Sequence, residues 1–381
     1  MSKPQLTRAT VGAVVGAGAC LVAVSLAAPV AHASPTRSTA TGQHRSPAVA
    51  HVASSPGLVV HTLIRGASHG WSSPDDLTVS GADLFVAFQN GVPSTGGATG
   101  TPTQSTIVRF TRAGVITAAW QLVGKCDGLA ADPSHHRLIA TVNEDGNSSL
   151  YTIPTTQGAD RIRRYRYDAA PLPHGGGTDN VTIRAGAIYV VASAPTAGGP
   201  ALYRVELRDN VAHLASAPFY DTSQATLANP GAAGRSINLA LTDPDSSTLV
   251  PVSASRFQGD FMLDAQGDQQ AVFATGLDTD HQTLQVLNLS QSVDDTAFAA
   301  TSTGILLADD TNTDTVLAIT GPLTAGAPYT AVTPGNANNS PTNPAPNYLG
   351  RIDLHTGTVT AVPTTGDPLQ PHSLLFVPGT H

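Results

Sequence analysis

Acidic residues recur at one position of a repeated sequence pattern, and this recurrence is the strongest sign of chemistry in the chain. The pattern is a polar turn, a short strand, a glycine turn and a second strand, clearest in residues 74–90 (PDDLTVSGADLFVAFQN). Further copies begin near positions 125, 177, 235, 292 and 371. The marker residues, two positions before the first strand of each copy, are Asp75, Asp127, Asp179, Ile237, Asp294 and His372.

The markers are 52, 52, 58, 57 and 78 residues apart, and a strand unit with a period near 50 is typical of a β-propeller or similar array. In a propeller the innermost strands begin around one mouth of a central channel, so equivalent positions converge there. We therefore expect one polar cluster built from the markers and their neighbours. Its candidate ligand-binding residues are Asp75, Asp127, Asp179, Asn180, Asn238, Asp294, Asp295 and His372.

Several carboxylates that face one cavity raise one another's pKa or bind a hard cation such as Ca²⁺ or Mg²⁺ through oxygen ligands. The candidate metal ligands are Asp127, Asp179 and Asp294, and His372 is the candidate catalytic general base. The alternative is that each aspartate caps the turn that enters its strand by accepting a backbone N–H. Ile237 interrupts the series and argues against strict symmetry.

Two shorter motifs resemble metal-binding or catalytic signatures. Residues 310–314 (DTNTD) alternate like the first half of a calcium loop, but Thr315 stands where the loop needs glycine and the closing glutamate is missing. Residues 66–70 read G-x-S-x-G, yet Pro74 and the aspartates after it cannot start the long helix of a nucleophile elbow. We expect an ordinary hairpin loop and a chance match.

Residues 161–167 (RIRRYRY) carry four arginines where an outermost strand is expected. As a strand they would point Arg161, Arg163 and the two tyrosines one way, and Arg164 and Arg166 the other. One interpretation is that these charges block edge-to-edge aggregation of the sheet. The other is a contact with an anionic polymer such as an acidic glycan.

The composition favours an all-β fold. Of the 381 residues only 12% are charged, while 36 are Gly and 28 are Pro, which fits short strands joined by turns better than helices. Four full units, a long fifth interval and a shared blade predict a six-bladed β-propeller, with five or seven blades as alternatives. The strands at 58–64 and 374–377 are expected to share the closing blade, which would remove exposed sheet edges.

The chain divides into three parts. Residues 1–33 read as a secretory signal peptide, with a basic start, an apolar run and an A-x-A cleavage site. Residues 34–56 are rich in Ser, Thr, Ala and Pro and are predicted to be a disordered linker. Residues 57–381 are predicted to form a single propeller domain. Within it, the Pro- and Asn-rich residues 321–347 are interpreted as a surface insertion or a loop that carries one extra hairpin.

Charge and cysteine content exclude some classes of function. Removal of the signal peptide would leave 17 of the 19 basic residues against 27 acidic ones, a poor balance for neutralising nucleic-acid phosphates. Only Cys126 would remain, so no intrachain disulfide is possible, and we expect this thiol to be buried. The sequence thus predicts a secreted monomer with no nucleic-acid partner and no membrane segment after processing.

Several short motifs recur across roughly residues 57–379. The repeats begin with P-x-x or x-D-G, and their second strands contain Leu-Tyr/Phe-Val. Two longer segments are GILLADDTNTDTVLAIT from Gly304 and QPHSLLFVPG from Gln370. On these motifs the chain resembles NHL-type and SMP-30/strictosidine-synthase-type propellers, including streptogramin-lyase-like proteins. The resemblance implies a central channel that can hold a metal, often calcium, which assists lactone or ester hydrolysis. The lyase family's Pro-His-Gly occurs once, at residues 173–175.

Two functions follow from these observations. The first is a binding module that presents one channel mouth to a small ligand, an extracellular polymer or a protein, because no complete catalytic constellation is visible and a fold does not define a function. The second is a metal-dependent hydrolase or lyase, with Ca²⁺ or Mg²⁺ held by the marker aspartates and His372 as the base. The sequence leaves this choice open.

Overall fold

The computed structural model describes residues 57–98, 100–155, 161–196 and 198–379, which belong to one compact unit, Ser54–His381. The predicted signal peptide (1–33) and linker (34–56) lie outside the described residues. Within those residues the helical elements are two 3-10 turns, η1 (Gly66–His69) and η2 (Pro133–His135). None of the helices there has the length and apolar character needed to span a membrane.

All other regular structure is β-strand, arranged in five hydrogen-bonded sheets. One four-stranded sheet contains β2 (Pro74–Ser80), β3 (Asp83–Phe88), β4 (Gln104–Phe110) and β5 (Ile116–Val123). An eight-stranded sheet contains β6 (Cys126–Asp132), β7 (Arg137–Val142), β8 (Ser149–Pro154), β9 (Arg163–Tyr167), β10 (Thr178–Arg184), β11 (Ala187–Ala192), β12 (Pro200–Arg208) and β13 (Val211–Tyr220).

The remaining three sheets come from the second half of the chain. A six-stranded sheet contains β14 (Gln224–Leu227), β15 (Ser236–Asn238), β16 (Pro244–Leu249), β17 (Phe261–Ala265), β18 (Gln270–Thr275) and β19 (Thr283–Asn288). A four-stranded sheet contains β20 (Val293–Phe298), β23 (Pro328–Val332), β24 (Tyr348–Ile352) and β25 (Val359–Ala361). A five-stranded sheet contains β1 (Leu58–Arg65), β21 (Gly304–Asp310), β22 (Thr315–Thr320), β26 (Thr364–Gly366) and β27 (Leu374–Pro378).

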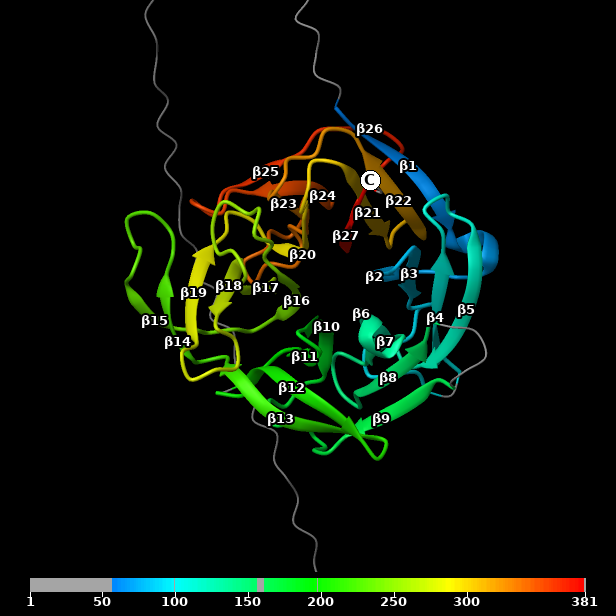
Figure 1. The fold of residues 1–381 in the computed structure, drawn as a ribbon, viewed down its shortest axis with the longest axis horizontal. Coiled ribbons are helices and arrows are strands. Elements are labelled where there is room, and N and C mark those ends of the chain that lie inside the picture. The colour runs from blue at the N-terminus through cyan, green and yellow to red at the C-terminus, as the bar shows by residue number, and fades with distance from the viewer. Residues whose placement is uncertain (1–56, 99, 156–160, 197, 380–381) are drawn as a thin grey trace, which may run out of the picture. The chain divides into compact units, whose positions relative to one another are not determined.

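The sheets are arranged around a central axis, as Figure 1 shows. Strands β2, β6, β10, β16, β20 and β27 lie nearest the axis, while β5, β9, β13 and β19 lie at the periphery. The eight-stranded sheet consists of two antiparallel four-stranded runs, which join where the outer strands β9 and β13 pair in parallel. The predicted all-β propeller is therefore confirmed.

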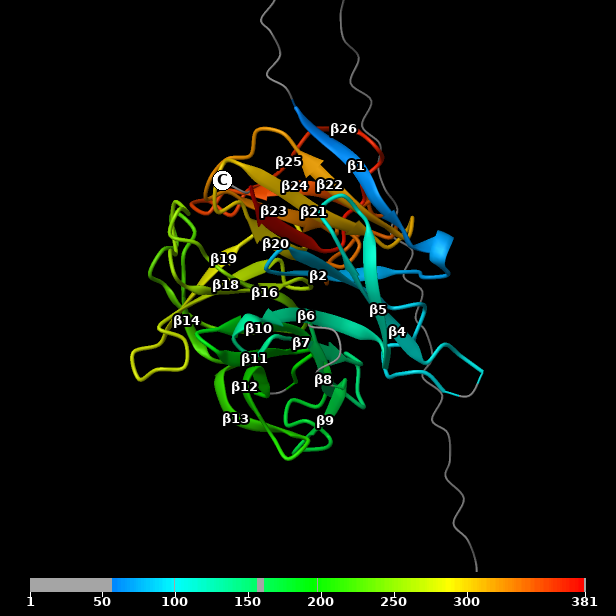
Figure 2. The ribbon, with the colours of Figure 1, turned by 45° about the vertical axis from the view of Figure 1, so that its right-hand side comes forward.

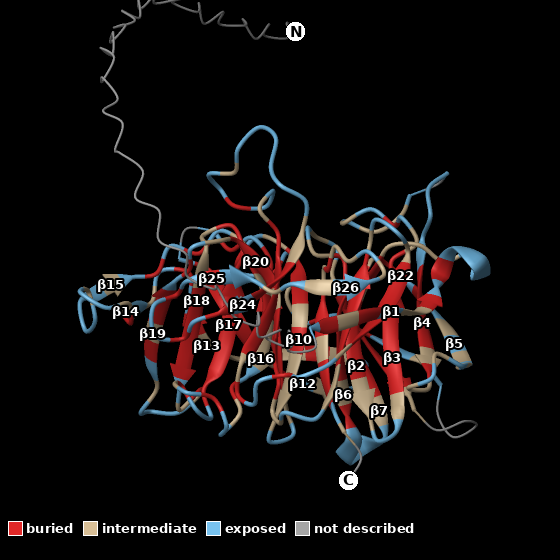
Figure 3. Cartoon of the chain, turned by 90° about the horizontal axis from the view of Figure 1, so that it is seen from above, coloured by how far each residue is buried: buried red, intermediate tan, exposed pale blue. Residues whose placement is uncertain are grey.

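Burial along the strands explains their sequences. In β3 every residue after the first is buried, and in β7 and β11 the same pattern recurs, because neighbouring sheets cover both faces of these strands. In β5, at the periphery, partly buried residues alternate with exposed ones, as expected of a strand that is covered on one face only. In Figure 3 the buried residues form the middle layer and the exposed ones gather in the loops at either end.

Alternate side chains of one strand join two different cores. Phe85 of β3 packs in a cluster with Leu138 of β7, on the side of the following sheet. Val86, the next residue, packs in a cluster with Leu307 of β21, on the side of the closing sheet. Cys126 is fully buried in the first of these clusters, which confirms the expectation of a buried thiol.

Strands from both ends of the described unit close the ring. In the five-stranded sheet the order is β26-β1-β22-β21-β27, so β27 faces the axis and β1 lies near the outside. Figures 1 and 2 both show this order from the rim inward. The predicted closure by the N- and C-terminal strands is confirmed, because β1 and β27 belong to the same sheet.

Two sequence-based assignments are wrong. The stretch from Arg235 is not an innermost strand, because β15 within it pairs with β14 at the outer edge, and β16 takes the inner place. Residues 321–347 are not simply a surface insertion or an added hairpin, because they contain β23, whose residues are all buried between β20 and β24. Here β20 pairs with β23, while the intervening β21 pairs with β27 in the next sheet.

The burial of Phe85 gives a test of the packing. Phe85 is fully buried, so we expect Phe85→Ala to lower the free energy of unfolding by about 3–5 kcal/mol, through lost transfer energy and a residual cavity. Val123, at the end of β5, is 49% exposed, and Val123→Ala serves as the control with an expected change within about 0.5 kcal/mol. Urea unfolding of both variants measures this, and equal losses would contradict the assigned core.

Candidate functional site: an acidic pocket at the centre of the ring

A cavity of about 330 Å³ lies where the innermost strands begin. Two potential cations, Lys125 and His372, face it together with amide and hydroxyl side chains. Ten carboxyl groups line the same cavity: Asp75, Asp76, Asp127, Glu144, Asp145, Asp179, Asp243, Asp245, Asp294 and Asp295. The pocket is therefore strongly acidic, and repulsion among its carboxyl groups is the main electrostatic effect within it.

The repeated markers do meet in this pocket. Its lining includes Asp75, Asp127, Asp179, Asp294 and His372, with the neighbours Asn180 and Asp295. The fourth inner strand contributes Asp245 of β16, which the sequence analysis missed. Ile237 and Asn238 belong to the peripheral strand β15 and do not line the pocket, so Asn238 was wrongly placed in the cluster.

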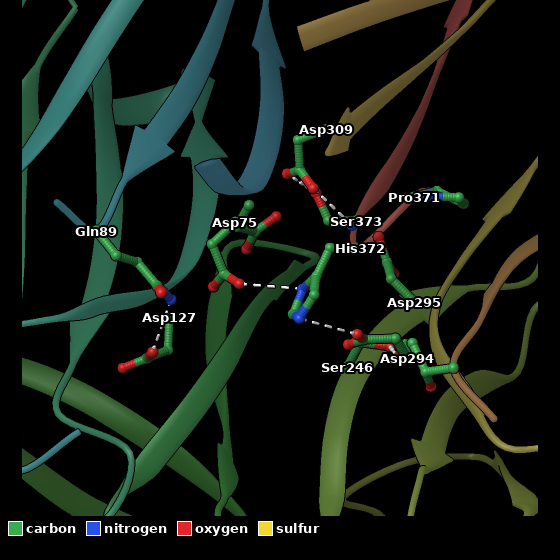
Figure 4. A network of polar contacts seen from close by, with 12 residues as sticks. Asp75, Gln89, Asp127, Ser246, Asp294, Asp295, Asp309, Pro371, His372 and Ser373 are labelled. Atoms are coloured by element: carbon green, nitrogen blue, oxygen red, sulfur yellow. Dashed lines mark hydrogen bonds and ion pairs between the residues drawn. The ribbon is translucent and has the colours of Figure 1, made fainter. Parts of the chain in front are cut away.

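His372 bridges two carboxylates from opposite parts of the chain, as Figure 4 shows. Its Nδ1 lies 3.2 Å from Asp75 Oδ1, and its Nε2 lies 3.3 Å from Asp294 Oδ2. The turn that carries it is anchored on Asp309, which accepts hydrogen bonds from the backbone N–H of His372 at the carbonyl and of Ser373 at the carboxylate. Residues far apart in sequence thus fix the imidazole at both nitrogens.

The carboxylates decide the protonation state of this histidine. Burial by itself would lower the pKa of His372, but the hydrogen bond to Asp75 and the charges of Asp75 and Asp309 outweigh it and raise the pKa to about 9. At neutral pH the imidazole is therefore a cation with no free lone pair. This opposes the predicted role of His372 as a general base, which needs the neutral ring.

Lys125 neutralises a second part of the pocket. Its ammonium lies 3.0 Å from Asp127 Oδ1 and also contacts Glu144. Burial lowers the pKa of Lys125, but the charges of Asp127, Asp75 and Glu144 outweigh that effect and raise it, so the side chain stays charged. Gln89 donates a further hydrogen bond to Asp127 Oδ1.

Other carboxylate oxygens in the pocket have no partner. Asp127 is 5% exposed, and its Oδ2 accepts no hydrogen bond. Asp179 is 7% exposed, and neither of its carboxylate oxygens receives a hydrogen bond or ion pair from the described residues. Burial raises the pKa of Asp179, and the charges of Asp245, Glu144 and Asp127 raise it further. These two groups keep hydrogen-bonding capacity that the described protein does not use.

The capping role proposed as the alternative belongs to the residues one position later. Asp76 accepts hydrogen bonds from the backbone N–H of Leu77 and Leu129, both at 2.6 Å. Asp295 likewise accepts from the N–H of Thr296 and Leu374, both at 2.7 Å. Each carboxylate caps its own strand and links it to the next inner strand.

Asn180 makes the same kind of link between β10 and β16, because its Oδ1 accepts hydrogen bonds from the backbone N–H and hydroxyl of Ser247. The markers Asp75, Asp127 and Asp179 have no such backbone partner among the described residues. Their side chains are therefore left to face the cavity, and strand-linking falls to the following position.

The pocket residues do not fit a preformed metal site. Within the described part of the chain, no three His, Cys, Asp or Glu side chains are grouped closely enough to hold a metal ion, the predicted trio Asp127, Asp179 and Asp294 included. The physical reason is that Lys125 contacts Asp127 and His372 contacts Asp294, so protein cations occupy places that a metal would need.

The two short motifs have local structural roles. Asp310 Oδ1 accepts the backbone N–H of Asn312 and Thr313 in the turn between β21 and β22, and Asp314 caps Ser73. Ser68, in the G-x-S-x-G stretch, donates its hydroxyl to the carbonyl of Arg65 within η1. These contacts agree with the expected hairpin loop and chance match.

The opposite end of the central channel differs in polarity. A second cavity of about 510 Å³ is lined largely by apolar side chains, including Val79, Ile183 and Leu375. It shares Asp76 and Asn180, and also Asp295, with the acidic pocket, so these strand-linking residues form the boundary between the two.

The bridging contacts of His372 predict how stability depends on pH. The folded-state pKa of about 9 lies above the ordinary value of 6.5, so this stabilisation is complete below pH 6.5 and is lost as pH rises through 9. We expect the difference in unfolding free energy between wild type and His372→Gln to fall by up to about 3 kcal/mol between pH 6 and pH 9.5. Chemical denaturation at both pH values measures it, and a constant difference would contradict the charged imidazole.

No protein-family model matches the sequence, and a search of curated proteins found no match. Among solved structures, a streptogramin B lyase is similar over 84% of this chain and 91% of its own, with 11% identity and a TM-score of 0.42. The periplasmic gluconolactonase of Pseudomonas aeruginosa is similar over 80% of this chain and 88% of its own, with 12% identity and a TM-score of 0.45. The soluble aldose sugar dehydrogenase of Escherichia coli is similar over 69% and 99%, with 9% identity and a TM-score of 0.37. Lyase and lactonase structures thus stand among those similar to this chain, as its repeats suggest, and similarity at this level assigns it no activity.

Proposed function

We propose that this chain is a ligand-binding propeller whose acidic central pocket takes a small polar molecule that carries ammonium groups. The observation that carries the proposal is a pair of buried aspartates in the pocket lining. Asp127 Oδ2 accepts no hydrogen bond, and the carboxylate of Asp179 has no hydrogen-bond or ion-pair partner among the described residues. A buried carboxylate is costly unless it is paired, and an ammonium group would supply both the charge and the donors.

The balance of charge favours a cationic ligand over other kinds. Ten carboxyl groups line the cavity, against the two cations Lys125 and His372, and each of these cations already contacts a carboxylate. An anionic ligand would add to the repulsion, and a neutral sugar would leave the charge uncompensated. An ammonium group donates up to three hydrogen bonds and accepts none, which matches an acceptor-rich lining.

The volume of the cavity supports a small ligand. About 330 Å³ lies near the lower limit of ordinary small-molecule pockets, which run from roughly 300 to 1,000 Å³. A linear diamine, a polyamine segment or an amino sugar would fit this volume. A protein partner would reach the pocket only with a single side chain or terminus.

The same proposal includes the architecture and location expected from the sequence. Six inner strands contribute to or border the pocket, which supports a six-bladed ring, with the eight-stranded sheet counted as two blades. The signal-like residues 1–33 support secretion, and the closed ring supports a monomer. The ligand would then be an extracellular molecule.

The metal-dependent hydrolase or lyase has less support. Of the three carboxylates expected to hold Ca²⁺ or Mg²⁺, Asp127 and Asp294 are paired with Lys125 and His372, and the histidine expected to act as base is a cation at neutral pH. We therefore derive no catalytic step for this pocket.

Binding of spermidine tests the proposal directly. We expect spermidine to raise the Tm of the protein, while the neutral polyol sorbitol and the anion gluconate do not. Asp179→Asn and Asp127→Asn should each weaken spermidine binding at least tenfold, because each removes a carboxylate that would pair with a bound ammonium group. The exposed Asp280 lies outside the pocket lining, so Asp280→Asn is the matched control. Calorimetry measures these affinities, and an unchanged affinity for spermidine in both pocket variants would contradict the proposal.

The raised pKa of Asp179 adds a second readout to the same measurement. A bound cation favours the ionised carboxylate, so spermidine binding should release protons and weaken as pH falls. Calorimetry in two buffers of different ionisation enthalpy counts these protons. Proton uptake on binding would contradict the assignment.

Metal addition separates the two candidate functions. Because protein cations already contact the pocket carboxylates, we expect Ca²⁺ or Mg²⁺ to raise the Tm of EDTA-treated protein less than spermidine does at the same concentration. A larger rise with Ca²⁺ that disappears in Asp127→Asn would favour the metal-dependent enzyme instead.

A further inference from the structure

The outer rim of the propeller carries a basic strand, although the chain as a whole is acidic. Strand β9 (Arg163–Tyr167) lies at the periphery in Figures 1 and 2. Together with Arg161 just before it, the strand places four of the chain's 19 basic residues within six positions. Arg161, Arg163, Arg164 and Arg166 are all exposed. Such a concentration of charge on a chain of formal net charge −8 calls for a local explanation.

Both faces of this strand are basic. On one face, Arg161 and Arg163 line a cavity of about 240 Å³ with Arg137 and His135, floored by the buried Tyr165. On the other face, the Nε of Arg164 donates to Ser149 Oγ at 3.0 Å, and its guanidinium lies 6.0 Å from the ring centre of Tyr151.

The neighbouring acidic groups leave most of this charge uncompensated. Asp132 accepts from Arg137 Nε at 2.9 Å and also pairs with His135, so it neutralises the inner part of the cavity. Among the described residues, Arg161, Arg163 and Arg166 form no ion pair with a carboxylate. Arg161 and Arg163 thus line a concave surface without an ion-pair partner among the described residues.

Protection of a sheet edge does not account for this arrangement. Charged side chains protect a sheet edge by opposing the addition of another strand. Part of the edge is also covered, because Arg166 and Tyr167 pair with Val211 and Ala212 of β13. Neither effect requires arginines on both faces of the strand, nor a cavity between Arg137 and Arg163.

We infer that this rim binds an acidic polysaccharide through its carboxylate or sulfate groups. A guanidinium group forms bidentate hydrogen bonds with such anions, which suits the choice of arginine over lysine. From residue 161 to residue 166 a strand extends about 17 Å, and the side chains project to opposite faces. Arginines on opposite faces, such as Arg163 and Arg164, cannot converge on one small ion, but together they can contact successive charges of a polymer that crosses the rim.

This site is independent of the acidic pocket. None of the residues that line the rim cavity lines the central pocket. A polymer held at the rim would place the propeller against a polysaccharide surface while the pocket remains open. Failure of either proposal therefore leaves the other intact.

Surface plasmon resonance of the full chain on immobilised heparin, polygalacturonate and inorganic polyphosphate tests the inference. We expect binding to heparin, polygalacturonate or both, weakened at least tenfold by the double variant Arg161→Ala/Arg163→Ala and weakened by added salt. Heparin alone would identify sulfate as the recognised group, and polygalacturonate alone would identify carboxylate. Arg235→Ala, at an exposed position outside the rim cavity, is the matched control and should leave binding unchanged.

Three outcomes would overturn the inference: no binding to either polysaccharide, equal binding by the double variant, or binding to polyphosphate alone. A second variant, Arg161→Lys/Arg163→Lys, keeps the charge and removes the planar fork. Guanidinium recognition is supported if the lysine variant binds with an affinity between those of wild type and the alanine variant. It is also supported if the lysine variant does not bind. Circular dichroism of each variant checks that these exposed substitutions leave the fold intact.

Discussion

Repulsion among the carboxylates at the axis is the constraint to which the rest of this structure responds. In a propeller the first residues of the inner strands lie close together around the axis. In this chain most of the inner strands have an aspartate there. Two kinds of contact make this tolerable. Lys125 and His372 place positive charge against Asp127, Asp75 and Asp294. One residue further along, carboxylates and an amide bind the backbone of the next inner strand and hold the ring together.

Charge of opposite sign is therefore separated by position in the fold. The cavity at the centre is lined by acidic side chains, whereas the cavity at the rim beside β9 is lined by basic ones. This separation reduces the chance that the arginines neutralise the pocket within the same molecule. The two proposals made above follow this separation, with small cations at the axis and extended anions at the periphery.

Much of the fold could be predicted from the sequence, because the turn-strand-turn-strand pattern repeats with nearly constant spacing in the first half. The second half was harder. Asp245 was missed because it lies 66 residues after Asp179, with β14 and β15 added between the sheets, and the stretch from Arg235 imitates the repeat. β23 was missed because Pro328 and the surrounding Pro- and Asn-rich residues read as a loop, although tertiary contacts bury that strand.

The candidate site was predictable in place but not in chemistry. Equivalent positions converge by geometry alone, so Asp75, Asp127, Asp179, Asp294 and His372 could be grouped without coordinates. The charge on His372 depends on carboxylates contributed by other strands, and no local pattern in the sequence encodes that. A difference of one position in the sequence likewise decides whether an aspartate caps a strand or faces the cavity.

The exchange of strands between the last two sheets has a mechanical consequence. After β20 the chain forms β21 and β22 of the closing sheet and then returns to pair β23 with β20. Strands of the two sheets therefore alternate along the chain. The seam where the termini meet is thus locked by an internal segment as well as by β1 and β27. Peeling away either terminus would not free a whole blade, and the ring is built to come apart as one cooperative unit rather than to unzip from its ends.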